Sequence, residues 1–203
     1  MRVPFIVLDF ETTGMSPGSG ARATEIGAVL VQDGRITDRF QSLMNAGVRI
    51  PFFIQQLTGI TNAMIADAPP CDDVMRRFHA FIGDRPLVAH NAAFDRKFLD
   101  AEFSRVGLHT SQPMICSMRL ARRIFQDAPN HKLGTLVKYA NIETDGVFHR
   151  ALADAEMTAR LMLKMTDHLR RSHGLKEIGV DLLQQLESTP KAKAASRLRL
   201  LHG

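Results

Sequence analysis

The start of the chain carries three strand patterns in a row, before any long helical pattern. An apolar run over residues 3–8 reads as a buried strand. Residues 25–31 and 35–44 read as two more strands, joined at Gln32-Asp33-Gly34. Because Asp-Gly between two strand patterns is a strong hairpin signal, we expect these strands to form an antiparallel meander.

Helical patterns alternate with short strands in the rest of the chain. Two short apolar strands are expected at 86–90 and 114–116. Helices are expected over residues 51–57, 72–82, 92–106, 117–125, 133–139, 150–168 and 175–186. A meander followed by this alternation predicts an α/β fold, with a mixed five-stranded sheet flanked by helices. The later strands should pair in parallel.

Two carboxylates follow the first strand at spacing i, i+2. Side chains two apart along an extended chain point to the same side, so Asp9 and Glu11 should share one face at the strand end. Two like charges so close repel each other. A divalent cation, which prefers oxygen ligands, would relieve that repulsion. The alternative is a strand that runs into a solvated turn at Thr12-Thr13-Gly14.

A third carboxylate lies where a strand meets a helix. In the stretch His90-Asn91-Ala92-Ala93-Phe94-Asp95, Asn91 is a good N-cap type. Asp95 falls in the first turn of the expected helix, where the helix dipole favours a carboxylate. Asp95 therefore has a structural explanation as well as a functional one.

The segment His149-Arg150-Ala151-Leu152-Ala153-Asp154 opens the clearest helical pattern. Five residues of helix correspond to about 500°, which puts the two ends about 140° apart around the axis. His149 can share a site with Asp154 only if it precedes the helix or is its first residue. Asp154 lies at the border of the apolar stripe, where an unpaired charge is costly. A lone His near a helix start is otherwise polar surface.

Together these segments supply Asp9, Glu11, Asp95 and Asp154, plus His149, whose side chain titrates near neutrality. Four carboxylates can hold two hard cations about 3.5–4 Å apart, an arrangement that stabilises the attacking and leaving oxygens of an in-line phosphoryl displacement. His149 would then be the general base that takes a proton from water.

These three segments resemble the three exonuclease motifs of the DnaQ-like 3′–5′ exonucleases. The pattern is of the DEDDh type, with His-x4-Asp in the third motif, and is most similar to the exonuclease domain of the bacterial polymerase III epsilon subunit. The resemblance covers about residues 3–170. It implies a ribonuclease H-like fold and two Mg²⁺ or Mn²⁺ ions.

The resemblance also assigns roles to residues. Asp9, Glu11 and Asp154 match the main metal ligands, Asp95 the fourth carboxylate, and His149 the general base. The substrate-binding residues that it suggests are Thr12, Leu57, Thr58, Ile60, His90 and Asn91. Leu57 and Ile60 would wedge against the last base. The Thr12 and Thr58 hydroxyls would reach sugar or backbone, although both threonines can equally be turn formers.

Charge bears on the nucleic-acid partner only locally. The net charge is +5, but residues 188–203 hold Lys191, Lys193, Arg197 and Arg199 and no acid, so the rest of the chain is nearly neutral. Single-strand binding needs basic side chains near the cleft. The candidates between residues 117 and 138 are Arg119, Arg122, Arg123, Lys132 and Lys138. A basic run of this kind can also be a solvated face.

The sequence also suggests how the chain divides into domains. We expect an exonuclease domain at 1–174, ending at Gly174, and a C-terminal helix with a mobile basic tail at 175–203. No apolar run approaches the roughly 20 residues that span a bilayer, so a soluble, cytoplasmic protein without a membrane partner is expected. Cys71 and Cys116 are isolated in the sequence, and neither belongs to a CxxC pair, so we expect both to be buried thiols.

The leading hypothesis is a 3′–5′ exonuclease that releases nucleoside 5′-monophosphates from a single-stranded or frayed DNA end, in proofreading or repair. The second is the same chemistry on RNA, as in oligoribonuclease. The third is an accessory module of a DNA polymerase or sliding clamp, for which Gln184-Gln185-Leu186 is a weak clamp-peptide signal. Such a role would add to catalysis.

Overall fold

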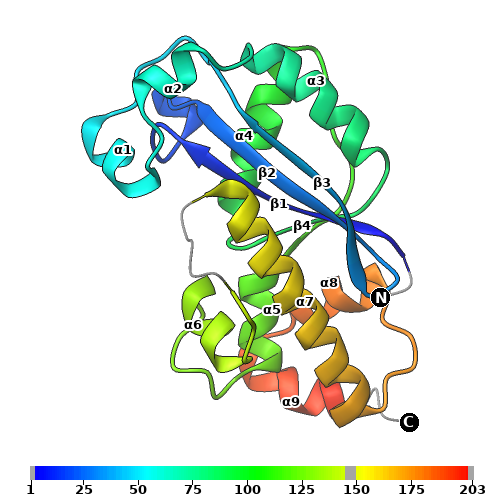
Figure 1. The fold of residues 1–203 in the computed structure, drawn as a ribbon. Coiled ribbons are helices and arrows are strands. Elements are labelled where there is room, and N and C mark those ends of the chain that lie inside the picture. The colour runs from blue at the N-terminus through cyan, green and yellow to red at the C-terminus, as the bar shows by residue number, and fades with distance from the viewer. Residues whose placement is uncertain (1–2, 145–149, 201–203) are drawn as a thin grey trace.

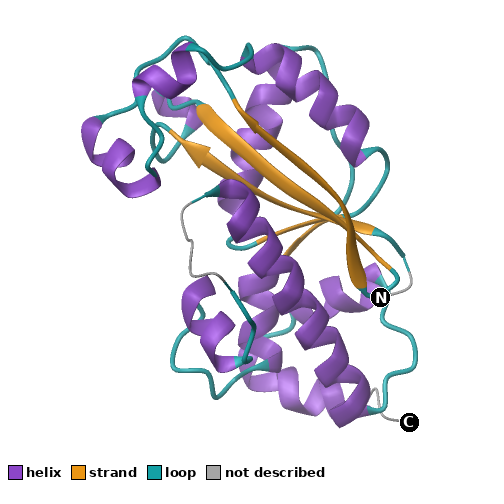
Figure 2. Ribbon diagram, in the orientation of Figure 1, coloured by secondary structure: helices purple, strands orange, loops and turns teal. Residues whose placement is uncertain are grey.

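The computed structural model describes residues 3–144 and 150–200 of the chain. A five-stranded sheet forms its centre, with helices against both faces (Figures 1 and 2). The strands are β1 (Phe5–Thr12), β2 (Ala23–Gln32), β3 (Arg35–Leu43), β4 (Leu87–Ala89) and β5 (Met114–Cys116). The helices are η1 (Pro17–Ser19), α1 (Phe52–Thr58), α2 (Asn62–Ala66), α3 (Cys71–Ile82), α4 (Ala93–Arg105), α5 (Ser117–Ile124), α6 (Leu133–Tyr139), α7 (Ala151–His173), α8 (Val180–Ser188) and α9 (Lys191–Leu200).

The strand order β3-β2-β1-β4-β5 confirms the expected mixed sheet. β1 pairs antiparallel with β2 and parallel with β4, so it lies where the two halves of the sheet meet. The hairpin between β2 and β3 turns at Asp33 and Gly34, whose φ angles are 52° and 77°. Two successive positive φ angles are what a type I′ turn requires, and Asp-Gly supplies them.

The alternation of side chains along β1 divides the core into two parts. Ile6, Leu8 and Phe10 pack with α3 and α4 on one face. Phe5 and Val7 pack with α5 and α7 on the other. Because side chains two apart share a face, Asp9 continues the row of Phe5 and Val7 on the face that α7 covers.

Gly27 lets the beginning of α7 approach the sheet closely. Gly27 pairs with Asp9 across β1 and β2. A Cβ added to Gly27 would lie 2.1 Å from the backbone nitrogen of Leu152 and 2.2 Å from the carbonyl carbon of Ala151. The absent side chain thus sets the distance between β2 and the first turn of α7.

We therefore expect Gly27→Ala to destabilise the protein by about 3 kcal/mol or more, because backbone atoms cannot swing aside as a flexible side chain can. Urea unfolding followed by circular dichroism measures the loss. Gly179→Ala is the matched control, since a Cβ there meets nothing within 4 Å. Equal stability of the two variants would contradict the close approach.

The structure departs from the sequence-based expectations at several places. β1 continues past the apolar run to Thr12, because β2 pairs with it over that whole length. The helix α2 was not predicted, and α8 begins at Val180 rather than at residue 175.

The mobile tail is also corrected. Residues 191–200 form α9, in which Ala194 and Leu198 are buried. Their i, i+4 spacing places both on one side of the helix, where Leu198 joins the core of α5 and α7. The domain boundary at residue 174 stays a prediction; there, Gly174 ends α7 in a left-handed conformation, as expected.

Candidate active site

Three carboxylates from distant parts of the chain meet at one point. Asp9 and Glu11 project from the second half of β1, and Asp154 from the first turn of α7. One oxygen from each of them lies within 4.8 Å of the other two. This confirms that Asp9 and Glu11 share a face, although within the strand rather than at its end. It also shows that α7 carries a third carboxylate to them.

Asp95 lies beside this cluster without belonging to the group of three. Its side chain is 1% exposed, and its Oδ1 accepts a hydrogen bond of 3.2 Å from the backbone N–H of Phe10. β4 pairs with β1 only at Ile6 and Val7, so the strand edge beyond Val7 has no β4 partner. Asp95 covers that edge.

Burial and mutual repulsion make these carboxyl groups hard to ionise. Burial is the largest cause, and it raises the pKa of Asp9 well above its ordinary value, with Asp95 and Asp154 adding to the shift. Burial and the charge of Asp154 raise the pKa of Glu11 to about 7. Burial raises the pKa of Asp95 to about 8. Carboxylates gathered at such a cost suit a divalent cation, which favours their charged form.

Glu25, which the sequence analysis missed, fixes the beginning of α7 beside the cluster. Its carboxylate is fully buried and accepts hydrogen bonds from Arg150 Nε and Nη2, from the Ala151 N–H, and from Gln41 Nε2. It pairs with Glu11 across the strands. The available signal was a carboxylate in the apolar strand of residues 23–32, at the same parity as Gly27 and Val29.

A cleft of about 490 Å³ opens in front of the carboxylates. Asp9 and Asp154 line its floor, and α6 lines one wall with Lys132 and Lys138, both exposed. Neither lysine forms an ion pair among the residues that the structure describes. The cleft therefore offers acidic oxygens to a cation and ammonium groups to a polyanion.

His90 also lines the cleft, in the neutral form. Burial is the main reason that its pKa falls to about 4, and the charge of Arg122 lowers it further. Its Nε2 donates to the carbonyl of His131 at 3.1 Å, and its Nδ1 accepts from the Ser117 hydroxyl at 2.9 Å. Both ring nitrogens are thus engaged, one with the segment before α6 and the other with the beginning of α5.

Several expected substrate-binding residues lie elsewhere or are otherwise engaged. Asn91 is not the N-cap of α4, which is Ala92; it adopts a left-handed conformation and lines a different pocket. The Thr12 hydroxyl donates to the carbonyl of Gly14. The buried Thr58 hydroxyl donates to the carbonyl of Ile54 and accepts from the N–H of Ile60. Both threonines thus stabilise local turns.

Of the two expected wedge residues, only Leu57 is accessible. Leu57 is 58% exposed, whereas Ile60 is completely buried. Ile60 packs with Ile50, Ile54 and Ile65 in a small core beneath α1 and α2. The helix that carries Leu57, α1, also exposes Phe52 and Phe53, which the sequence analysis did not single out.

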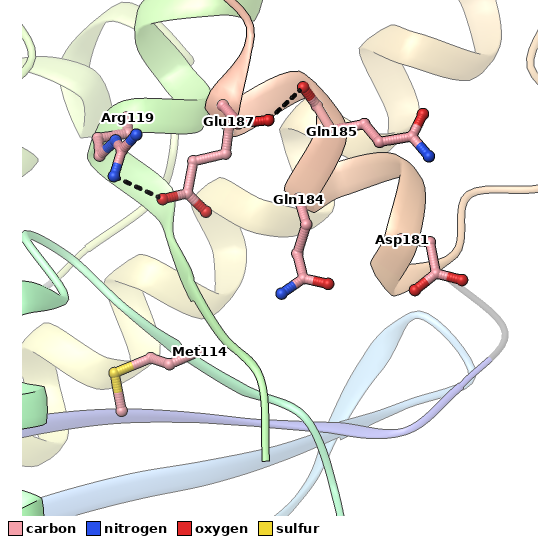
Figure 3. Close-up of a pocket in the computed structure, with 7 residues that line it drawn as sticks. Met114, Arg119, Asp181, Gln184, Gln185 and Glu187 are labelled. Carbon is pink, nitrogen blue, oxygen red and sulfur yellow. Dashed lines mark hydrogen bonds and ion pairs between the residues drawn. The ribbon is translucent and has the colours of Figure 1, made fainter. Parts of the chain in front are cut away.

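Of the remaining basic candidates, Arg122 lies near enough to His90 for its charge to act on that ring, whereas Arg119 and Arg123 make contacts elsewhere. Arg119 pairs with Glu187 at 3.5 Å on the wall of a second pocket, of about 610 Å³, between β5 and α8 (Figure 3). Arg123 donates to the carbonyl of Thr189. No carboxylate of the cluster lines the second pocket, so we place the site in the smaller cleft.

No described helix is both long enough and apolar enough to cross a membrane.

Comparison with known proteins identifies the family of the chain. The family model RNase T, described as exonuclease, matches residues 6–162. The DNA polymerase III subunit epsilon of Aquifex aeolicus is 35% identical over 172 residues, which are 84% of each chain. A PolC-type DNA polymerase III of Bacillus cereus is 42% identical over 162 residues, 79% of this chain. The chain spans only about 11% of that polymerase.

Solved structures share the fold. Exonuclease X in complex with 5′ overhanging duplex DNA has a TM-score of 0.70 at 27% identity, covering 91% of this chain and 99% of that one. The nuclease domain of 3′hExo, a DEDDh family member bound to rAMP, has a TM-score of 0.71 at 20% identity, covering 82% and 92%. These findings, and the carboxylates that the fold brings together, show that the chain belongs to the exonuclease family of the DnaQ-like, DEDDh type.

Proposed function

We propose that the chain is a metal-dependent 3′–5′ exonuclease that removes nucleoside 5′-monophosphates from a single-stranded or frayed DNA end. The observation that carries this proposal is the meeting of Asp9, Glu11 and Asp154, the first and last of which line a cleft that also carries two lysines. Two of the relatives bear the name of DNA polymerase III or its subunit, which favours DNA over RNA.

In this proposal, Asp9, Glu11 and Asp154 hold two Mg²⁺ or Mn²⁺ ions, with Asp95 as the fourth carboxylate. When bound, the ions supply Lewis-acid stabilisation of the negative charge that develops on the scissile phosphate. His149 takes a proton from the attacking water. His149 lies outside the described residues, so its role stays a prediction from sequence.

Digestion of labelled oligonucleotides tests the proposal. Purified protein with Mg²⁺ should shorten a 5′-labelled single-stranded DNA stepwise from the 3′ end, and the same DNA with a blocked 3′ end should be shortened more slowly. A matched RNA oligonucleotide in parallel decides between DNA and the oligoribonuclease alternative. Absence of shortening with either sugar, in Mg²⁺ and in Mn²⁺, would end the proposal.

A DNA polymerase is the partner that the relatives favour, since two of them are named as polymerase III or its subunit. The sliding clamp has less support. In Gln184-Gln185-Leu186, Leu186 is fully buried in α8, so this triplet is not displayed as a free peptide. Co-purification of the polymerase with the tagged chain tests the first partner.

Lys132 and Lys138 are expected to bind the phosphates of the substrate strand. Log K for binding falls as log salt concentration rises, and each single-strand phosphate that a lysine neutralises makes this fall steeper by about 0.7. The variant Lys132→Ala/Lys138→Ala should therefore bind oligothymidylate more weakly, and its salt dependence should be shallower by about 1.4. Fluorescence anisotropy in EDTA measures both.

The matched control is Lys191→Ala/Lys193→Ala, which removes two exposed lysines from α9. That variant should keep the salt dependence of the parent chain. If the two variants lose the same slope, the lysines of the cleft act only through net charge.

A further inference from the structure

The short helix α1 turns three large apolar side chains toward solvent. Phe52 is 73% exposed, Phe53 68% and Leu57 58%, whereas Ile54 on the opposite side of the helix is buried. An exposed apolar cluster is costly to keep in water and commonly marks an interaction site. Ile54 anchors the helix from below in the small isoleucine core, so the cluster is held on a structured base.

Strand register places this helix close to the carboxylate cluster. Glu11 pairs with Glu25, and Glu25 pairs with Leu43, so the three residues form one row across β1, β2 and β3. With strands about 4.8 Å apart, Leu43 lies about 10 Å from Glu11. Leu43 packs against the small core under α1. Because paired residues share a face, α1 borders the same face of the sheet as the carboxylates.

The part of the cleft that α6 lines carries positive charge. α6, with Lys132 and Lys138, lies on the same side of the molecule as α1, and the beginning of α7 lies between them (Figure 1). Sites for single-stranded nucleic acid combine two such elements: basic side chains that follow the phosphates, and aromatic rings on which bases stack. A protein partner would explain the phenylalanines, but not their place beside an acidic floor and a basic wall.

We propose that Phe52 and Phe53 form a stacking platform for bases of the substrate strand upstream of the terminal nucleotide. This inference rests on the proposed function, whose site it extends. The platform contacts any base through its ring face, so it should support binding without sequence preference. It plays no part in the hydrolytic step.

Two substrates separate the platform from the chemistry. The p-nitrophenyl ester of thymidine 5′-monophosphate carries one nucleotide and cannot reach the platform, whereas oligothymidylate can. Loss of one stacked base costs about 1–3 kcal/mol, or roughly 5- to 150-fold in affinity. We expect Phe52→Ala/Phe53→Ala to raise KM for oligothymidylate about tenfold or more, and to leave kcat/KM for the ester unchanged.

Leu200→Ala is the matched control, because Leu200 is an apolar side chain that is 79% exposed on α9. It should leave both substrates unaffected. If the parent chain hydrolyses neither substrate, the proposed function fails while the platform can still be tested by binding.

Binding can be read directly because the chain contains no tryptophan. Phe53→Trp introduces a single tryptophan at the platform, and its indole ring can stack on bases as the phenyl ring does. Oligothymidylate added in EDTA should quench its fluorescence, since stacked bases quench indole. The variant Phe52→Ala/Phe53→Trp should bind more weakly, and Leu200→Trp should show no quenching.

The inference is overturned if oligothymidylate binds, as measured by anisotropy, without quenching the indole of Phe53→Trp. It is also overturned if Phe52→Ala/Phe53→Ala leaves KM unchanged. A parent dimer that dissociates in this variant, with KM unchanged, would assign the cluster to contact with a second copy of the chain.

Discussion

Asp9→Asn is expected to lower kcat/KM on a 5′-labelled oligonucleotide by about a thousandfold. A cation that stabilises charge on a phosphate is worth several kcal/mol, and each 1.36 kcal/mol corresponds to a factor of ten in rate. Asp9 lies at the centre of the cluster, where Asp95, Asp154, Glu11 and Glu25 all act on it. Isothermal titration with Mn²⁺ should show the loss of metal affinity that accompanies the loss of rate.

Asp100→Asn is the matched control. Asp100 lies on α4, half exposed, and pairs with Arg96 at 2.8 Å. A surface pair of this kind contributes little to stability, so its loss should leave rate and metal affinity unchanged. Asp9→Asn should also melt no lower than the parent chain in EDTA, because it removes a repelling charge. A lower melting temperature would attribute the loss of activity to unfolding.

The sheet could be predicted because its signals are local. The Asp33-Gly34 turn and the apolar strand patterns lie within short stretches, and the structure confirms β1 to β5 in the expected order. The ends of the strands and helices were predicted less accurately than their existence, and this difference has a physical cause. β1 reaches Thr12 because a separate strand, β2, supplies hydrogen-bond partners to that point. Similarly, α9 is held by Leu198 against the core of α5 and α7.

The site was partly predictable because some of its signals are local too. The i, i+2 spacing of Asp9 and Glu11 fixes their common face in any strand, whichever fold surrounds it. Whether Ile60 or Phe53 meets the substrate depends instead on which of them the isoleucine core buries, and that core joins separate segments. Glu25 was missed because its partners, Arg150 and Ala151, lie more than a hundred residues away.

The role of Asn91 shows a second limit. Asn is favoured both as an N-cap and in the left-handed conformation, and local sequence does not separate the two. In the structure its φ is 68°, and the helix begins later, at Ala93. The sequence predicted that a strand meets a helix at this point, but not the backbone conformation of Asn91.

Without divalent cations, the protein is expected to lose stability as pH rises from about 6.5 to 8. Glu11 and Asp95 have pKa values raised to about 7 and about 8, chiefly by burial. In the unfolded chain such groups titrate near 4, so in this range the folded chain binds protons that the unfolded chain does not. Stability conferred by those protons is present at lower pH and is lost as pH rises through the folded pKa values.

One such proton corresponds to about 1.4 kcal/mol per pH unit, or a fall in melting temperature of about 3 to 5 °C per unit. The range begins at pH 6.5 for a reason. His90 has a pKa lowered to about 4, so between about 4 and 6.5 its neutral folded form makes an opposing contribution, which increases stability as pH rises. Above 6.5 the histidine no longer opposes the carboxyl groups, and thermal melts in EDTA report on them.

Mg²⁺ or Mn²⁺ should remove this loss. A cation binds the charged carboxylates, and at about 100 times its Kd it stabilises the folded chain by about 2.7 kcal/mol, or about 5 to 10 °C. The gain should be larger at pH 8 than at pH 6.5, because fewer protons then compete for the same oxygens. Asp9→Asn should flatten the pH dependence in EDTA and abolish most of the gain. Melts that respond to neither pH nor metal would show that these carboxyl groups are not the repelling cluster that the fold brings together.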